Sequence, residues 1–140
     1  MKIFVDTSAF IAFILDREFL HEQVSKQYSL YKQEKAYFFT SDYVLDELFT
    51  QCLYKAGRYH AKEAIALIDE ITTHNELTVL EIDSHTFKKA QEIFLKFSEH
   101  KISFTDATTY VLYKDFALDE IFTLDSDFKK MRAKTSSFVL

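Results

Sequence analysis

The chain contains, near its start, a short apolar segment that ends in a carboxylate: Ile3-Phe4-Val5-Asp6-Thr7-Ser8. Three residues that favour β-structure predict a buried strand, and the Asp-Thr-Ser sequence after them predicts a turn into a helix. In an open α/β sheet this places Asp6 at the carboxyl edge of a strand, where ligands bind. Asp6 can equally be read as a helix N-cap. Whether Asp6 belongs to a functional site therefore depends on whether other acids lie close to it at that edge.

Strands and helices alternate along the rest of the sequence. Further strands are expected at residues 37–40, 77–82, 120–124 and 138–140, and helices at residues 7–16, 20–35, 43–56, 58–73, 84–97, 103–117 and 127–132. Gly57 is placed to end the third helix. This alternation predicts a parallel sheet with helices on both faces, in a single three-layer α/β domain over residues 1–140.

Composition excludes several classes of function. The chain has 140 residues with 48% hydrophobic and 28% charged residues, as expected of a folded domain. It has no proline and one glycine, which excludes phosphate-binding loops of the Walker and dinucleotide types. Its lone Cys52 excludes a disulfide framework and a thiolate zinc site. The apolar segment near the start is interrupted by Asp6 and is too short to span a bilayer, so a soluble, cytoplasmic protein with no membrane partner is expected.

Two later segments also place acids beside hydroxyl residues. Ser103-Phe104-Thr105-Asp106 has the pattern of a helix capping box. Thr123-Leu124-Asp125-Ser126-Asp127-Phe128 reads as a strand that ends in two acids, although turns rich in Asp and Ser are common. Two neighbouring parallel strands that end in acids would bring like charges together, which is costly unless a cation lies between them. Ligands that are all oxygen suit Mg²⁺ or Mn²⁺ rather than zinc.

Another acidic pair, Asp46-Glu47, lies in the third predicted helix. The two residues flank the apolar stripe of that helix on opposite sides. Glu47 shares its face with Gln51, and Asp46 shares its face with Thr50. Periodicity favours Glu47 only weakly, so the residues alone leave the choice undecided.

These blocks together resemble the PIN domain, and most closely the VapC-type ribonuclease toxins. In order, the matching blocks are Val5-Asp6-Thr7-Ser8, Val44-Leu45-Asp46-Glu47-Leu48, Ser103-Phe104-Thr105-Asp106-Ala107 and Phe122-Thr123-Leu124-Asp125-Ser126-Asp127-Phe128. Each block is weak alone, but four in the same order over nearly the whole chain form a specific pattern. The resemblance implies a parallel sheet of strand order 3-2-1-4-5 and metal-dependent endonucleolytic cleavage of RNA.

The resemblance also assigns residues and partners. It places the second acid on Glu47 and implies a catalytic, metal-binding quartet of Asp6, Glu47, Asp106 and Asp125, with Asp127 as a less central ligand of one or two Mg²⁺ or Mn²⁺ ions. Ser8 and Thr123 match hydroxyl positions that support the ligands. The implied reaction is in-line attack of an activated water on phosphorus. A homodimer and a small antitoxin that blocks the acidic site are implied as partners.

Charge does not argue against an RNA substrate once the acidic site is set apart. The net charge is −5, and the five acids of the implied site account for all of it. Lys129, Lys130 and Arg132 follow the fourth block directly and are the preferred phosphate-binding residues, while Lys55, Arg58, His60 and Lys62 form a second basic cluster. Both clusters can also be read as ordinary solvated helix charges. Tyr43, Tyr54 and Tyr59 fit the core, an oligomer interface or base stacking, and no histidine is assigned to catalysis.

Other classes of protein compete with the ribonuclease toxin as an interpretation of this sequence. A phosphatase of the haloacid-dehalogenase type needs a second Asp two residues after the first, where this chain has Ser8; receiver domains fit no better. A PIN-type module could have lost activity and act by binding alone, although clustered acids without a metal would destabilise it. A PIN nuclease could also act in RNA processing outside any toxin system.

Overall fold

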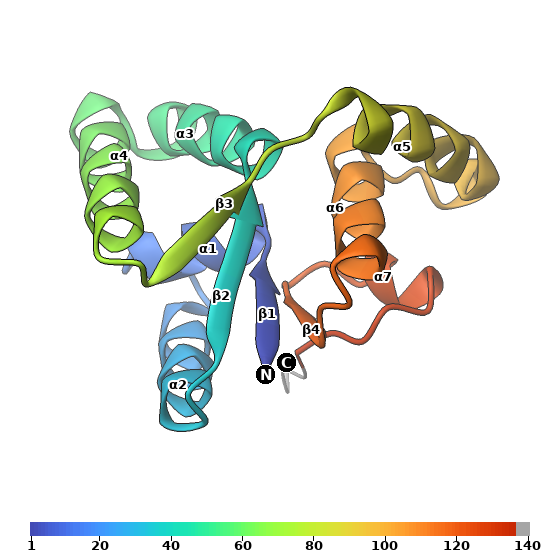
Figure 1. Ribbon diagram of the computed structural model, residues 1–140. Coiled ribbons are helices and arrows are strands. Elements are labelled where there is room, and N and C mark those ends of the chain that lie inside the picture. The colour runs from blue at the N-terminus through green and yellow to red at the C-terminus, as the bar shows by residue number, and fades with distance from the viewer. Residues whose placement is uncertain (137–140) are drawn as a thin grey trace.

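Four parallel strands form the sheet in the computed structural model, which describes residues 1–136 of the chain (Figure 1). They are β1 (Lys2–Val5), β2 (Tyr37–Ser41), β3 (Leu77–Leu80) and β4 (Glu120–Phe122), in the order β3-β2-β1-β4. Every pairing between them is parallel. Three of the four β1 residues are buried, as expected of a central strand covered on both faces.

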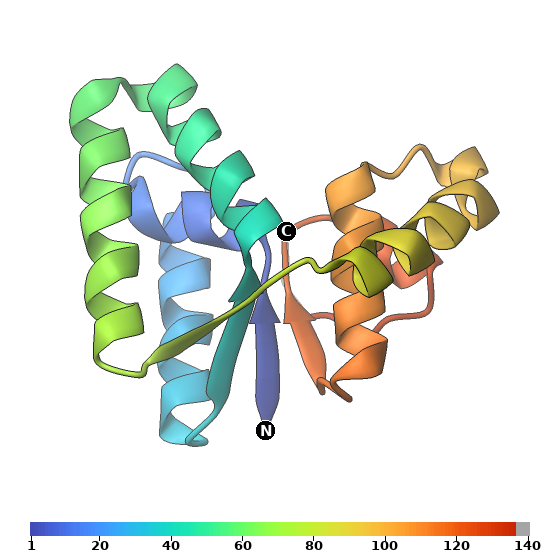
Figure 2. The ribbon, with the colours of Figure 1, turned by 45° about the horizontal axis from the view of Figure 1, so that its top comes forward.

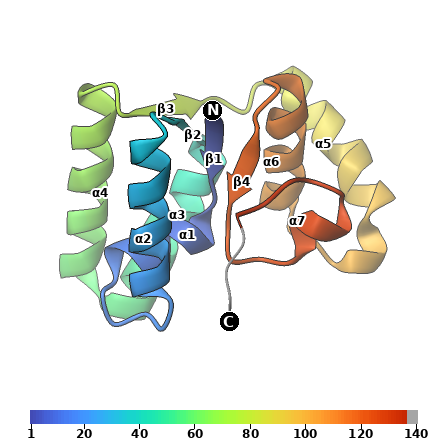
Figure 3. The ribbon, with the colours of Figure 1, turned by 90° about the horizontal axis from the view of Figure 1, so that it is seen from below.

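The helices lie on both sides of the sheet, as the alternation predicted. In chain order they are α1 (Thr7–Ile14), α2 (His21–Gln33), α3 (Asp42–Ala56), α4 (Arg58–Thr73), α5 (Ser84–Lys96), α6 (Phe104–Asp115) and α7 (Asp127–Lys130). Helices α1 to α4 gather on one side of β1 and β4, and α5 to α7 on the other (Figures 2 and 3). A 3₁₀ helix, η1 (Ser98–His100), follows α5 and was not predicted. None of the helices in this part of the chain is long and apolar enough to cross a membrane.

The fifth position of the predicted strand order is taken by a single bridge within the described residues. Ile121 of β4 donates its N–H to the Lys134 carbonyl and accepts from the N–H of Ser136, at 2.9 and 3.1 Å. Thr135 thereby forms a parallel bridge with Ile121 on the side of β4 away from β1. The order 3-2-1-4 is therefore confirmed. The strand predicted at residues 138–140 lies outside the described residues.

Helix ends in this glycine-poor chain use left-handed residues that are not glycine. Five such residues follow helices, with φ between 50° and 63°: Lys35, Asn75, Lys101, Ala117 and Arg132. After α6, for example, the N–H of Leu118 donates to the Tyr113 carbonyl at 3.0 Å, which closes the helix end around Ala117. A side chain at positive φ is strained because its Cβ approaches the backbone.

Replacement of Ala117 by glycine is therefore expected to stabilise the fold by about 1 kcal/mol, since glycine adopts positive φ without that strain. The matched control is Ala66→Gly, at an exposed position inside α4, where glycine should cost about 1 kcal/mol. Denaturant unfolding of both variants measures the two changes. Equal destabilisation by both substitutions would contradict the role assigned to the left-handed position.

Candidate functional site

Five of the acids singled out in the sequence line one pocket at the carboxyl edge of the sheet. Asp6 follows β1 and Asp125 follows β4, and these two strands are neighbours. Glu47 comes from α3 and Asp106 from α6. Together with Asp127 they line a pocket of about 380 Å³. The polypeptide thus brings together five carboxylates that are up to 121 positions apart in the sequence (6 to 127).

Asp6 is the most buried of these acids, with 5% of its surface exposed. It occupies the N-cap position of α1, but its side chain makes no capping hydrogen bond. Its Oδ2 instead accepts hydrogen bonds from Thr123 Oγ1 at 2.8 Å and from Ser8 Oγ at 3.2 Å. Burial raises the pKa of Asp6 to about 6, although the hydrogen bond from Thr123 opposes the rise. Asp6 is therefore the N-cap residue by position, but its side chain bonds to the end of β4 instead of capping the helix.

Ser8 and Thr123 connect the ends of β1 and β4 through their hydroxyl groups. The N–H of Leu124 donates to Ser8 Oγ at 2.9 Å, and the N–H of Asp125 donates to Thr123 Oγ1 at 3.0 Å. The two hydroxyl oxygens are themselves 3.2 Å apart. Both predicted hydroxyl residues thus contact an acid of the pocket or its backbone and fix where that acid lies.

Asp106 both caps helix α6 and lines the acidic pocket. It forms a capping box with Ser103, in which the N–H of Ser103 donates to Asp106 Oδ2 at 3.1 Å and the N–H of Asp106 donates to Ser103 Oγ at 3.0 Å. The same side chain lines the acidic pocket. Burial, and then the negative charge of Asp6, raise the pKa of Asp106 to about 7. Capping and a place in the pocket are compatible because a carboxylate has two oxygens.

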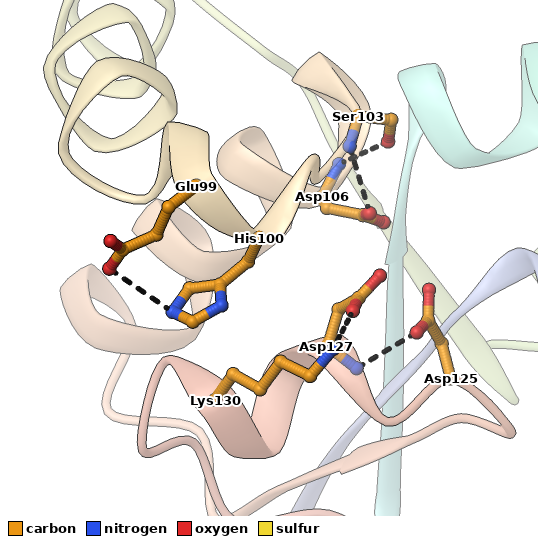
Figure 4. A network of polar contacts seen from close by, with 7 residues as sticks. All are labelled: Glu99, His100, Ser103, Asp106, Asp125, Asp127 and Lys130. Carbon is orange, nitrogen blue, oxygen red and sulfur yellow. Dashed lines mark hydrogen bonds and ion pairs between the residues drawn. The ribbon is translucent and has the colours of Figure 1, made fainter.

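Asp125 and Asp127 approach Asp106 from the loop after β4 and from the start of α7. The N–H of Asp127 donates to Asp125 Oδ1 at 2.8 Å, and Lys130 Nζ donates to Asp127 Oδ1 at 3.1 Å. Burial raises the pKa of Asp125. Asp106, Asp125 and Asp127 each offer one oxygen, and these three oxygens lie within 4.8 Å of one another. Figure 4 shows the three side chains pointing toward one another.

The geometry separates Glu47 from Asp46. Glu47 is partly buried and lines the pocket, and its Oε1 accepts a hydrogen bond from Gln51 Nε2 at 3.2 Å. Burial, and then the charge of Asp106, raise the pKa of Glu47. Asp46 is exposed and does not line the pocket. The choice that periodicity left open therefore falls on Glu47.

The predicted basic residues lie around the site and not in it. Lys129, Lys130 and Arg132 are exposed; Lys130 pairs with Asp127, and Lys129 lines a smaller pocket beside Asp125. In the second cluster, Lys55 pairs with Glu18 at 3.2 Å. Tyr54 and Tyr59 are 81% and 70% exposed, so neither belongs to the core.

Lys101 is the cation that the sequence patterns missed. It lines the acidic pocket, and so do Thr7, Gln51 and Ser103. The nearest signal in the sequence is that Lys101 lies two residues before Ser103, the first residue of the third acidic block.

The donor set fits a hard divalent cation. The five candidate ligands are all carboxylates, and oxygens of three of them lie within 4.8 Å of one another. The raised pKa values of Asp6, Asp106 and Asp125 reflect burial of negative charge that a cation would offset. Oxygen ligands of this kind suit Mg²⁺ or Mn²⁺.

Comparison with known proteins agrees with this architecture. The model of the PIN domain family matches residues 3–134. Among curated proteins, no sequence matches the chain. Among solved structures, VapC20 of Mycobacterium tuberculosis, described as a toxin that cleaves the sarcin-ricin loop, is similar with a TM-score of 0.82 and 24% identity over 94% of this chain and 95% of that one.

Two structures of VapBC bound to DNA are also similar. VapBC2 of Rickettsia felis, bound to a DNA fragment from its promoter, has a TM-score of 0.72 and 12% identity over 97% of this chain and 98% of that one. DNA-bound VapBC of Salmonella typhimurium has a TM-score of 0.69 and 15% identity over 97% of each chain. At these identities the likeness is one of fold.

Proposed function

This chain belongs to the PIN domain family, and we propose on that premise that it is a metal-dependent endoribonuclease that hydrolyses RNA phosphodiester bonds. The observation that carries the proposal is the convergence of Asp106, Asp125 and Asp127 in a pocket also lined by Asp6 and Glu47. Clustered carboxylates of this kind are costly for a protein that does not bind a cation. This cost speaks against a PIN-type module that acts by binding alone.

The proposed ligands of Mg²⁺ or Mn²⁺ are Asp6, Glu47, Asp106 and Asp125, with Asp127 in a lesser role. A divalent cation at such a site makes water more acidic and offsets charge on the phosphate. The protein's own contribution is to hold the ligands. Hydrogen bonds fix Oδ2 of Asp6, Oδ2 of Asp106 and Oδ1 of Asp125. A carboxylate held through one oxygen keeps its second oxygen for a cation, and it loses less conformational freedom when the cation binds.

The similar structures support a proposal about the partners of this chain. VapC20 is described as a toxin, and two of the similar structures are VapBC complexes. We therefore propose that this chain is the toxin of a toxin–antitoxin pair in the cytoplasm, that it forms a homodimer, and that a small antitoxin protein covers the acidic pocket. A nuclease of RNA processing would share the site and lack the antitoxin. A gene for a small protein directly beside the gene for this chain would favour the toxin.

The direct test is cleavage of labelled single-stranded RNA by the purified protein with Mg²⁺ or Mn²⁺. Cleavage is expected with either ion and should stop when EDTA is added in excess. Circular dichroism before and after EDTA verifies that the fold survives. A folded protein that binds no Mn²⁺ in calorimetry and cleaves no RNA would refute the proposal.

Glu47 and Asp46 provide a matched pair of adjacent acids for the metal site. Glu47→Gln is expected to weaken Mn²⁺ binding by about tenfold or more, because it removes a charged ligand from the pocket. Asp46→Asn removes an equal charge from the exposed face of the same helix and should change the Mn²⁺ dissociation constant by less than about twofold. Isothermal titration calorimetry measures both. Equal weakening by the two variants would show that only overall charge matters.

A further inference from the structure

Lys101 is the one basic side chain among the described residues that line the acidic pocket. It stands in the turn between η1 and α6, with φ of 54°, and its N–H donates to the Ser98 carbonyl at 3.1 Å. Two residues later, the N–H of Ser103 holds Asp106 Oδ2. The same short segment therefore positions both a pocket carboxylate and the backbone that carries this lysine.

The ammonium group of Lys101 is free of ion pairs within residues 1–136, although five carboxylates line the same pocket. Lys130, by contrast, pairs with Asp127 at 3.1 Å. Lys101 is also exposed, and its ammonium group carries three hydrogen-bond donors. A cation that does not neutralise the neighbouring acids remains available to an anion brought to the pocket from outside.

An RNA strand needs such a cation at this place. Phosphate groups that approach five carboxylates are repelled, and the charge of a divalent ion offsets this only where the ion sits. A lysine ammonium is a compact point charge that suits a phosphate oxygen without demanding a fixed orientation. Lys129, Lys130 and Arg132 do not line this pocket, whereas Lys101 does.

We propose that Lys101 binds a phosphate of the RNA strand that crosses the acidic pocket, and so acts as a substrate-binding residue. The inference rests on the proposed ribonuclease function and adds a residue to it. The contact is made to the bound strand before reaction. Removal of Lys101 should therefore raise KM and leave kcat nearly unchanged.

The test compares Lys101→Asn and Lys101→Arg with the matched control Lys35→Asn. Lys35 is also exposed and has nearly the same left-handed backbone, with φ of 57°, but it lies after α2 and outside the pocket. Asparagine tolerates this backbone better than lysine does, so neither variant should lose stability. Both remove one positive charge, which separates a local contact from a change in overall charge.

Binding of a fluorescein-labelled single-stranded RNA is measured by fluorescence anisotropy in Ca²⁺, with gels to verify that the RNA stays intact. Lys101→Asn should weaken binding about five- to tenfold and reduce the slope of log K against log salt by roughly 0.7, the value for one phosphate contact on a single strand. Lys101→Arg should retain most of the wild-type RNA affinity and most of the wild-type salt slope. Lys35→Asn should match the wild type, and Mn²⁺ binding should not weaken in any variant.

The outcomes distinguish this inference from the function on which it rests. If the wild type cleaves RNA and Lys101→Asn retains the wild-type affinity and salt slope, the lysine contact is refuted and the nuclease stands. An equal loss in Lys35→Asn refutes it too, because the effect would then be one of net charge. A fall in kcat at constant KM likewise contradicts a ground-state contact. A wild-type protein that neither binds nor cleaves RNA refutes both proposals.

Discussion

Asp6→Asn is expected to lower the rate of RNA cleavage by about a thousandfold, because it removes a charged ligand from the centre of the proposed metal site. The substitution is nearly isosteric. Its amide oxygen can accept the hydrogen bonds that Thr123 and Ser8 now donate to Asp6 Oδ2. Its amide nitrogen then faces the pocket, where it cannot bind a cation. Single-turnover cleavage with Mg²⁺ measures the rate.

The same variant should be at least as stable as the wild type at pH 7.5 in EDTA. Asp6 is 5% exposed, and its burial disfavours the ionised carboxylate that neutral pH demands. Loss of activity together with retained or increased stability separates a missing ligand from a damaged fold. Asp46→Asn, on the exposed face of α3, is the control and should keep wild-type activity. An Asp6→Asn protein with more than a tenth of wild-type activity would remove Asp6 from the ligand set.

Much of the fold and the acidic site could be predicted because both follow from where strands end. Val5-Asp6 and Phe122-Thr123-Leu124-Asp125 each mark an apolar strand followed by an acid, and parallel neighbours must place such ends at one edge of the sheet. The helices between the strands then follow from their own periodicity. A capping pattern does not exclude a place at this edge of the sheet, because Asp106 both caps α6 and lines the pocket.

Other features could not be predicted because they depend on tertiary contacts. Asp46 and Glu47 flank one apolar stripe, and only the packing of α3 beside the sheet edge turns Glu47 into the pocket. Lys101 follows η1 and itself has the left-handed backbone of the turn, and no periodic pattern in the sequence describes such a turn. Lys129, Lys130 and Arg132 are close to the fourth acidic block in sequence, but closeness in sequence does not determine which side chains line the pocket.

Without metal, the free energy of unfolding is expected to fall by about 3 kcal/mol between pH 5 and pH 7.5. The pKa of Asp6 is raised to about 6 and that of Asp106 to about 7, from ordinary values near 4 in the unfolded chain. Between pH 4 and 7 the folded protein therefore holds protons that the unfolded chain has released. Stability falls as pH rises wherever the native state binds more protons.

The drop should be smaller than the sum of two independent shifts, because the charge of Asp6 is itself one cause of the raised pKa of Asp106. Urea unfolding at several pH values in EDTA measures it. Asp106→Asn should flatten the profile, whereas Asp69→Asn, exposed on α4, should not. A free energy of unfolding that stays level or rises over this pH range would contradict the raised pKa values of Asp6 and Asp106.

Mn²⁺ should reverse the loss, and most strongly at the higher pH. Binding to the native state alone adds about 2.7 kcal/mol when the ion is at 100 times its dissociation constant. Carboxylates must release their protons to bind a metal, so the same titration that destabilises the free protein prepares the site for its ion. The stabilisation by Mn²⁺ should therefore grow between pH 5 and 7.5 and shrink in Asp106→Asn. In this view the cost carried by the free protein and its affinity for the cation have one origin, the burial of like charges at the edge of the sheet.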